Sequence, residues 1–142
     1  MIPLLISHQK VGIDFDGTLI EHPRSRLLQR FILANRDKEF HIVSFRSHGM
    51  EKNIERDLRI STLMTQVPLG LQHFTGVHNV PDALYEGWAM FGDADQQKVK
   101  DYLCWKATKC RELGCTIIVD DMSDVGPHCE EIGIRYLHPD NL

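Results

Sequence analysis

The 142-residue sequence predicts an α/β fold, a Rossmann-like three-layer α/β/α sandwich around a mainly parallel sheet of about five strands. Short runs of β-branched and apolar residues alternate along the chain with segments whose apolar residues have helical spacing. The runs are apolar on both faces, which is typical of strands that helices cover on both sides. The alternation of strand and helix favours parallel strands joined by right-handed crossovers.

Five runs are candidates for the strands of this sheet. The strong candidates are residues 11–15, 41–45 and 116–119, and the weaker ones are residues 74–80 and 134–137. Three segments between them place apolar residues on one face of a helix. These faces comprise Leu27, Leu28, Phe31 and Ile32; Met50, Ile54 and Leu58; and Val99, Leu103, Cys110 and Leu113. The last segment precedes Gly114, a residue type common at the C-terminal end of helices.

Length and composition indicate one globular domain that spans residues 1–142. The formal net charge of −4 argues against a nucleic-acid binder that works through a broad basic surface. No apolar stretch approaches the roughly 18 residues of a membrane span, and the N-terminus carries no basic leader. The four cysteines form no CxxC pair, so we expect reduced, mostly buried thiols and a cytoplasmic protein.

Polar side chains follow three of the predicted strands. Asp14 and Asp16 come at the end of the first strand, Ser44 at the end of the second, and Asp120 and Asp121 after a later one. In parallel sheets ligands bind beyond the carboxyl ends of the strands, so these side chains are expected to converge. Converging carboxylates repel unless a cation neutralises them, and oxygen ligands without His or Cys suit Mg²⁺. The sequence therefore predicts a magnesium site at this edge.

Three segments together resemble a known superfamily. They are DFDGTL at residues 14–19, the apolar strand that ends in Ser44, and IIVDD at residues 117–121, and Lys106 completes the set. This set is similar to the motifs of haloacid dehalogenase (HAD)-like phosphatases. The resemblance implies a Mg²⁺-dependent phosphomonoesterase that works through an aspartyl-phosphate intermediate.

The resemblance also implies a role for each position. Asp14 is the expected nucleophile, and Asp16 the general acid and base, with its backbone carbonyl on the metal. Ser44 and the lysine are expected to hold the transferring phosphoryl group. Asp121 is the expected direct metal ligand, and Asp120 is expected to support it directly or through water. Asp124 is a weaker ligand candidate, because its spacing from Asp121 differs from the commonest pattern of the superfamily.

Several lysines precede the IIVDD segment, and geometry favours Lys106 over Lys98, Lys100 and Lys109. A strand of about five residues rises roughly 16 Å, and a helix of about eight residues is roughly 12 Å long. A helix that begins near Lys106 and ends at Gly114 therefore starts level with the carboxyl edge of the sheet. One unbroken helix over residues 96–113 would instead favour the earlier lysines.

Arg46 and the two tryptophans leave alternatives open. Arg46 is either a ligand for the substrate phosphate or a solvated loop arginine. Trp88 and Trp105 are expected to serve packing rather than to form a platform for bases. His41 and His48 lie near a predicted site strand, but their separation follows no metal-ligand pattern. The segment 92–95 is interpreted as a turn.

The chain lacks room for a full cap domain, although residues 82–103 can form a small helical lid. An open site suits a phosphorylated small molecule, a nucleotide or a nucleic-acid end, and a homo-oligomer could close it. The alternative is a non-catalytic binding or regulatory module with the same fold, against which the complete set of site residues argues. A phosphotransferase of the mutase type is disfavoured, because it needs a cap that excludes water.

Overall fold

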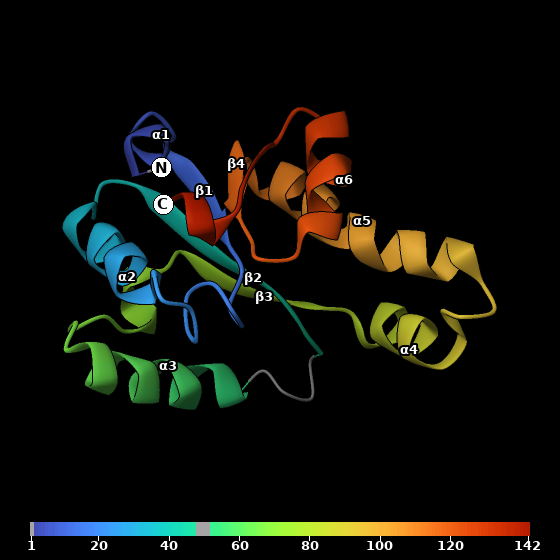
Figure 1. The fold of residues 1–142 in the computed structure, drawn as a ribbon, viewed down its shortest axis with the longest axis horizontal. Helices are drawn as coiled ribbons and strands as arrows, with labels where there is room; N and C mark the ends of the chain where they lie inside the picture. The colour runs from blue at the N-terminus through green and yellow to red at the C-terminus, as the bar shows by residue number, and fades with distance from the viewer. Residues whose placement is uncertain (1, 48–51) are drawn as a thin grey trace.

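Five parallel strands form one sheet in the order β3-β2-β1-β4-β5 in the computed structural model, which describes residues 2–47 and 52–142 (Figure 1). The strands are β1 (Lys10–Ile13), β2 (Glu39–Ser47), β3 (Gly76–Val80), β4 (Ile117–Val119) and β5 (Arg135–Leu137). Every pairing between neighbouring strands is parallel. The predicted α/β fold with a five-stranded sheet is therefore confirmed.

Helices cover both faces of this sheet (Figure 1). They are α1 (Ile2–Ile6), α2 (Ser25–Ala34), α3 (Lys52–Thr65), α4 (Asp82–Phe91), α5 (Gln96–Leu113) and α6 (Gly126–Glu131). Three short 3-10 turns complete the described elements, namely Leu71–His73, Ser123–Val125 and Pro139–Asn141. Met50 and His48, which figured in the sequence analysis, lie outside the described residues.

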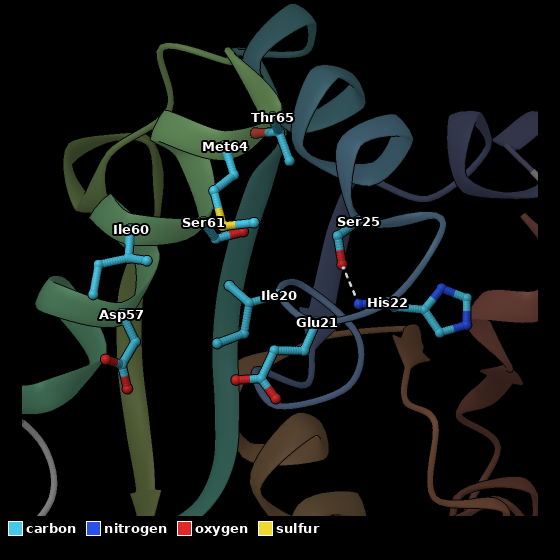
Figure 2. Close-up of a pocket in the computed structure, with 9 residues that line it drawn as sticks. All are labelled: Ile20, Glu21, His22, Ser25, Asp57, Ile60, Ser61, Met64 and Thr65. Carbon is cyan, nitrogen blue, oxygen red and sulfur yellow. Dashed lines mark hydrogen bonds between the residues drawn. The ribbon is translucent and has the colours of Figure 1, made fainter.

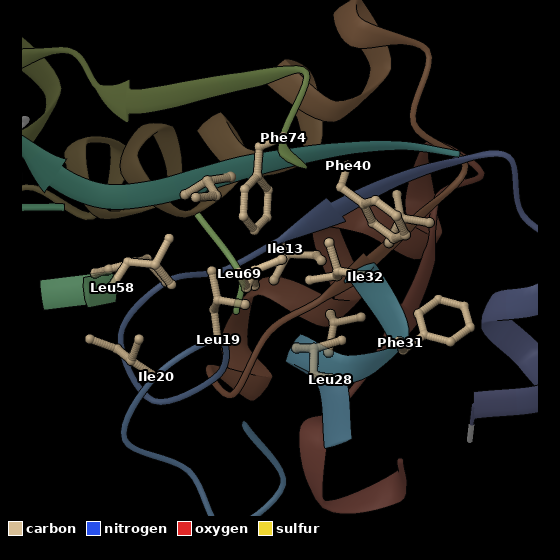
Figure 3. Packing of buried hydrophobic residues seen from close by; sticks show 14 of the residues in the cluster. Ile13, Leu19, Ile20, Leu28, Phe31, Ile32, Phe40, Leu58, Leu69 and Phe74 are labelled. Carbon is tan, nitrogen blue, oxygen red and sulfur yellow. The ribbon is translucent and has the colours of Figure 1, made fainter. Parts of the chain in front are cut away.

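Two apolar cores lie on opposite faces of the sheet because side chains alternate along each strand. In β4, Ile117 and Val119 join the core under α1, α2 and α3, whereas Ile118 joins the core under α5 and α6. Figure 3 shows part of the larger core, in which the rings of Phe31 and Phe40 meet edge to face at a centroid distance of 6.1 Å. Each fully buried aliphatic or aromatic side chain there contributes about 1.5–3 kcal/mol.

Strand β2 is longer than the sequence predicts, and this changes the setting of Ser44. The strand continues to Ser47, and its register with β3 shifts between Ser44 and Ser47. Such an irregularity re-aims the side chains that follow it. Ser44 therefore lies inside a strand and not at its end, and Arg46 is a strand residue and not a loop residue.

Helix α5 is also longer than predicted. It runs unbroken from Gln96 to Leu113, so the expectation of a helix that begins near Lys106 is wrong. Its start is capped by the side chain of Asp95, which accepts hydrogen bonds from the backbone N–H groups of residues 97 and 98, and it ends at Gly114 with φ +79°. The N-terminal half of α5 extends past the sheet beside α4 (Figure 1). Residues 82–103 thus form a helical hairpin that continues into the main fold.

All four cysteines are free thiols, and three of them are buried. In the part of the chain that the structure describes, every helix is too short or too polar to cross a membrane.

Candidate active site

The turn after β1 brings two acidic residues to the carboxyl edge of the sheet. The backbone N–H of Asp14 donates to the carbonyl of Val119 at 2.9 Å, which ties this turn to the end of β4. Gly17 follows with φ +73°, a conformation that favours glycine. A Cβ at Gly17 would lie 2.4 Å from Oδ2 of Asp121, so a larger residue would displace that carboxylate. Glycine at this position leaves the Asp121 carboxylate room to lie against the turn.

Lys106 joins two of the predicted carboxylates. Its Nζ donates to Oδ1 of Asp14 at 2.6 Å and to Oδ2 of Asp120 at 2.7 Å, and the lysine is 1% exposed. Lys106 therefore occupies the predicted position, although it lies in the middle of α5. The expectation that an unbroken helix over residues 96–113 would favour the earlier lysines is wrong, because the distance back from Gly114 still places Lys106 beside Asp14 and Asp120. The additional N-terminal turns of α5 leave that distance unchanged.

Burial sets the charge balance of this cluster. It raises the pKa of Asp14 from 3.8 to about 6, against the pull of Lys106. It likewise raises the pKa of Asp120 to about 6. Burial opposes the charge on Lys106, but the carboxylates of Asp14 and Asp120 outweigh it and raise the pKa of the lysine. Burial thus makes the ionised acids costly, and the positive charge of Lys106 between them offsets part of that cost.

Three carboxylates are close enough to share a metal ion. Asp14, Asp120 and Asp121 each offer an oxygen, and these atoms all lie within 4.8 Å of one another. Their chemistry fits Mg²⁺, since all the donors are hard oxygens. Both oxygens of Asp120 already accept hydrogen bonds, one from Lys106 and one from the backbone N–H of Met122 at 2.8 Å. Asp14 also accepts from Lys106 through Oδ1, and its Oδ2 has only the longer 3.3 Å contact with the Thr18 hydroxyl, so the exposed Asp121 has the most available oxygens.

Two other acidic residues stand outside this group. The carboxylate of Asp16 is held by Arg46, so only its backbone carbonyl fits the metal role that the resemblance implies. Asp124 is exposed on the 3-10 turn Ser123–Val125 and does not belong to the cluster. The weaker ligand candidate is thus separated from the other carboxylates.

Arg46 links the turn after β1 to helix α3. It donates from Nε to Oδ2 of Asp16 at 2.9 Å and from Nη2 to Oδ1 at 2.7 Å. Its Nη1 lies 2.8 Å from Oδ2 of Asp57 in α3, and its guanidinium lies 4.9 Å from the ring centroid of Phe15. Hydrogen bonding to Asp16 raises the pKa of Arg46. The solvated-arginine interpretation is therefore wrong, because the side chain is only 11% exposed.

The hydroxyl of Ser44 lies beneath the site. It accepts a hydrogen bond from the backbone N–H of Arg46 at 2.9 Å, and the residue is 1% exposed. It does not line the cavity described next. Its predicted contact with a phosphoryl group requires the hydroxyl to turn toward the acidic cluster.

Thr18 is a site residue to which the sequence analysis gave no role. It is fully buried, and its Oγ1 accepts from the backbone N–H of Asp121 at 3.1 Å. The same hydroxyl lies 3.3 Å from Oδ2 of Asp14 and 3.4 Å from Oδ1 of Asp121. Thr18 thereby fixes the spacing of two carboxylates, and its place in the DFDGTL segment was the only sequence signal for it.

A cavity of about 360 Å³ contains the cluster. Its charged lining consists of Asp14, Asp16, Arg46, Lys106, Asp120 and Asp121. Phe45, Tyr85 and Met122 supply the rest of the lining. Tyr85 comes from α4, a segment with no site motif, so no sequence feature predicted its presence here.

A larger cavity of about 530 Å³ lies between α3 and the turn that precedes α2 (Figure 2). Ile20, Ile60 and Met64 form much of its apolar wall. It contains none of the residues predicted for the active site. Asp57, which pairs with Arg46, also lines this cavity.

Comparisons of the chain with protein-family models, with curated proteins and with solved structures found no match.

Proposed function

We propose that this protein is a Mg²⁺-dependent phosphomonoesterase of the HAD type that uses Asp14 as its nucleophile. The observation that carries the proposal is the buried contact of Lys106 with Asp14 and Asp120, with Asp121 close enough to share a cation. Carboxylate nucleophiles form aspartyl-phosphates in established phosphoryl-transfer chemistry. A binding module has no need for a buried lysine between two acids at a cavity floor.

In the first half of the reaction, an oxygen of Asp14 attacks the phosphorus of the substrate. The bond between phosphorus and the leaving oxygen breaks, and Asp16 donates a proton to that oxygen. Arg46 holds both oxygens of Asp16 at 2.7–2.9 Å without substrate, so Asp16 must first be released. The phosphate oxygens of the substrate are the natural new partners for Arg46, because guanidinium groups bind phosphate in a bidentate manner.

In the second half, Asp16 takes a proton from water, which attacks the phosphorus of the aspartyl-phosphate. The bond between phosphorus and the Asp14 oxygen breaks. Orthophosphate leaves, and the carboxylate of Asp14 is regenerated. Lys106 balances the negative charge that moves between Asp14 and the phosphoryl oxygens. Its burial keeps this interaction strong, because little solvent screens it.

Mg²⁺ would be held by Asp14 and Asp121, with the Asp16 backbone carbonyl and support from Asp120. When bound, the ion supplies electrostatic stabilisation to the equatorial phosphoryl oxygens. Nucleoside monophosphates are the first substrate class to test, and 3′-phosphorylated oligonucleotides the second. A reducing, cytoplasmic setting agrees with the four free thiols.

The proposal is tested by the release of phosphate from p-nitrophenyl phosphate with and without Mg²⁺. Wild-type protein should release phosphate only with the metal, and Asp14→Asn should release none. Asp124→Asn is the matched control, since it makes the same chemical change at an exposed residue outside the cluster. Wild-type protein that binds Mg²⁺ and phosphate in calorimetry without turnover would instead favour the non-catalytic module.

A further inference from the structure

The cavity around the acidic cluster has an uncharged wall that phosphate chemistry does not require. Phe45, Tyr85 and Met122 form this wall, and Met122 is 38% exposed. The cavity volume of about 360 Å³ leaves room for more than a phosphate group. The wall is therefore positioned to contact the leaving group of a substrate whose phosphate lies on the aspartates.

A column of stacked rings holds α4, and with it Tyr85, against the rest of the fold. Trp88 of α4 stacks on Tyr102 of α5 with centroids 4.5 Å apart and planes 8° apart. Tyr102 in turn stacks on Phe45 of β2 at 4.2 Å and 18°. Tyr85 lies 6.0 Å from Trp88 on the same helix. The position of Tyr85 is thus set by packing that reaches β2, next to the catalytic cluster.

The same column ends at the proposed phosphate site. The Nζ of Lys106 lies 4.2 Å from the ring centroid of Phe45, so the lysine that contacts Asp14 also rests on the last ring of the column. An ammonium group over an aromatic face is a favourable contact. The aromatic wall and the acidic floor are therefore parts of one structure.

The uncharged wall has little capacity for hydrogen bonds. Of its three side chains only Tyr85 has a hydroxyl, and this hydroxyl makes no hydrogen bond to any described residue. Sugar hydroxyls placed against this wall would lose hydration without gaining partners, so a sugar alone is a poor fit for it. A planar ring would gain contact with Tyr85, and aromatic stacking accepts every base because each has a π-face.

We infer that the substrates are nucleoside monophosphates and that the base, held against Tyr85 and Met122, is the part that is recognised. This inference rests on the proposed function. Purines should be preferred to pyrimidines because of their larger ring area. Adenine and guanine should be nearly equivalent, since a single hydroxyl offers little means of telling their edges apart.

The test compares AMP, GMP and CMP with ribose 5-phosphate, which has the same sugar and phosphate as AMP but no base. Wild-type kcat/KM should be at least about 10-fold higher for AMP than for ribose 5-phosphate, because the KM for AMP is lower and kcat is similar. Tyr85→Ala should raise the KM for AMP by about 10-fold, leave kcat similar and leave ribose 5-phosphate unaffected. Tyr85→Phe should behave as wild type, and Tyr85→Leu as the alanine variant.

Two further variants act as controls. Met90→Ala changes an exposed residue of the same helix outside this cavity and should leave all four substrates unchanged. Ile60→Ser changes the wall of the larger cavity beside α3 and should also leave the preference for AMP unchanged. If Ile60→Ser abolishes that preference, or Tyr85→Ala affects AMP and ribose 5-phosphate equally, the inference is wrong.

A binding experiment separates this inference from the proposed function. AMP is titrated by calorimetry into Asp14→Asn, and into the same variant that also carries Tyr85→Ala. The inference requires about 10-fold weaker binding of AMP to the double variant. Failure of wild-type protein to hydrolyse p-nitrophenyl phosphate overturns the proposed function alone. Equal binding of AMP to the two variants overturns the role of Tyr85 alone.

Discussion

Replacing the proposed nucleophile with its neutral isostere should make the metal-free protein more stable. Asp14 is buried, and burial raises its pKa from 3.8 to about 6. At pH 7 the carboxylate is thus ionised in a site that disfavours its charge. Asp14→Asn keeps the shape and removes the charge, while Lys106 keeps its contact with Asp120 at 2.7 Å.

The expected size of this effect follows from the shift in pKa. A shift from 3.8 to about 6 corresponds to about 3 kcal/mol of cost for the ionised form. Because Lys106 loses one of its two charged partners, the net gain in the free energy of unfolding should be about 1–3 kcal/mol. For a chain of this length that is a rise in Tm of roughly 4–12 °C.

The effect should depend on pH in a defined direction. Because the pKa of Asp14 is higher in the folded than in the unfolded chain, the folded state binds more protons between pH 3.8 and about 6. The stability of the wild type therefore falls as pH rises through this window. The titration of Asp14 is absent from the variant, so the difference between the two proteins should vanish below about pH 4 and be complete near pH 7.

Urea denaturation in EDTA at pH 4 and pH 7 measures this difference, with Asp124→Asn as a control that should stay within about 0.5 kcal/mol of wild type. Added Mg²⁺ should stabilise wild-type protein by about 1.4 kcal/mol at ten times its Kd and should have much less effect on Asp14→Asn. An Asp14→Asn variant that is less stable than wild type in EDTA at pH 7 would refute the reasoning. The reasoning would also be refuted if Asp14→Asn were more stable than wild type by the same amount at pH 4 as at pH 7.

Three other substitutions probe different parts of the structure. Lys106→Met leaves two buried carboxylates without their cation. Urea denaturation at pH 7 should show the free energy of unfolding lowered by about 3–5 kcal/mol. A loss below about 1 kcal/mol would contradict the burial of the cluster. Gly17→Ala must displace the Asp121 carboxylate and places an alanine at the strained backbone angle of φ +73°. Calorimetry should therefore show the Mg²⁺ affinity reduced by about 10-fold or more. An unchanged affinity would count against Asp121 as a ligand. Gln66→Gly relieves φ +60° just after α3 and should stabilise the protein by about 0.5–1 kcal/mol in thermal unfolding, with no change in the phosphate release that the proposed function predicts.

Local sequence was enough to predict the fold class and the identity of the acidic cluster. Apolar runs define buried parallel strands, and residues that follow such strands must meet at one edge of the sheet. That rule brings Asp14, Asp120 and Asp121 together, but it also predicted the carboxylate of Asp16 and the hydroxyl of Ser44 there, and the structure holds both apart from the cluster. The position of Lys106 also followed from local geometry, because it depends only on the distance back from Gly114 along a helix packed on the sheet.

Contacts between distant segments could not be predicted in this way. The pairing of Arg46 with Asp16 and Asp57 depends on the extra length of β2, on its irregular register with β3 and on the path of α3. Tyr85 reaches the site only because the ring of Trp88 stacks on Tyr102, which fixes α4 beside β2. Strand and helix periodicity report which face of an element is buried, and so they determined the sheet and its acidic edge. Periodicity carries no information on how far an element extends or on which side chains from distant parts of the chain come into contact. Packing in three dimensions alone therefore decided the partners of Arg46 and the aromatic wall.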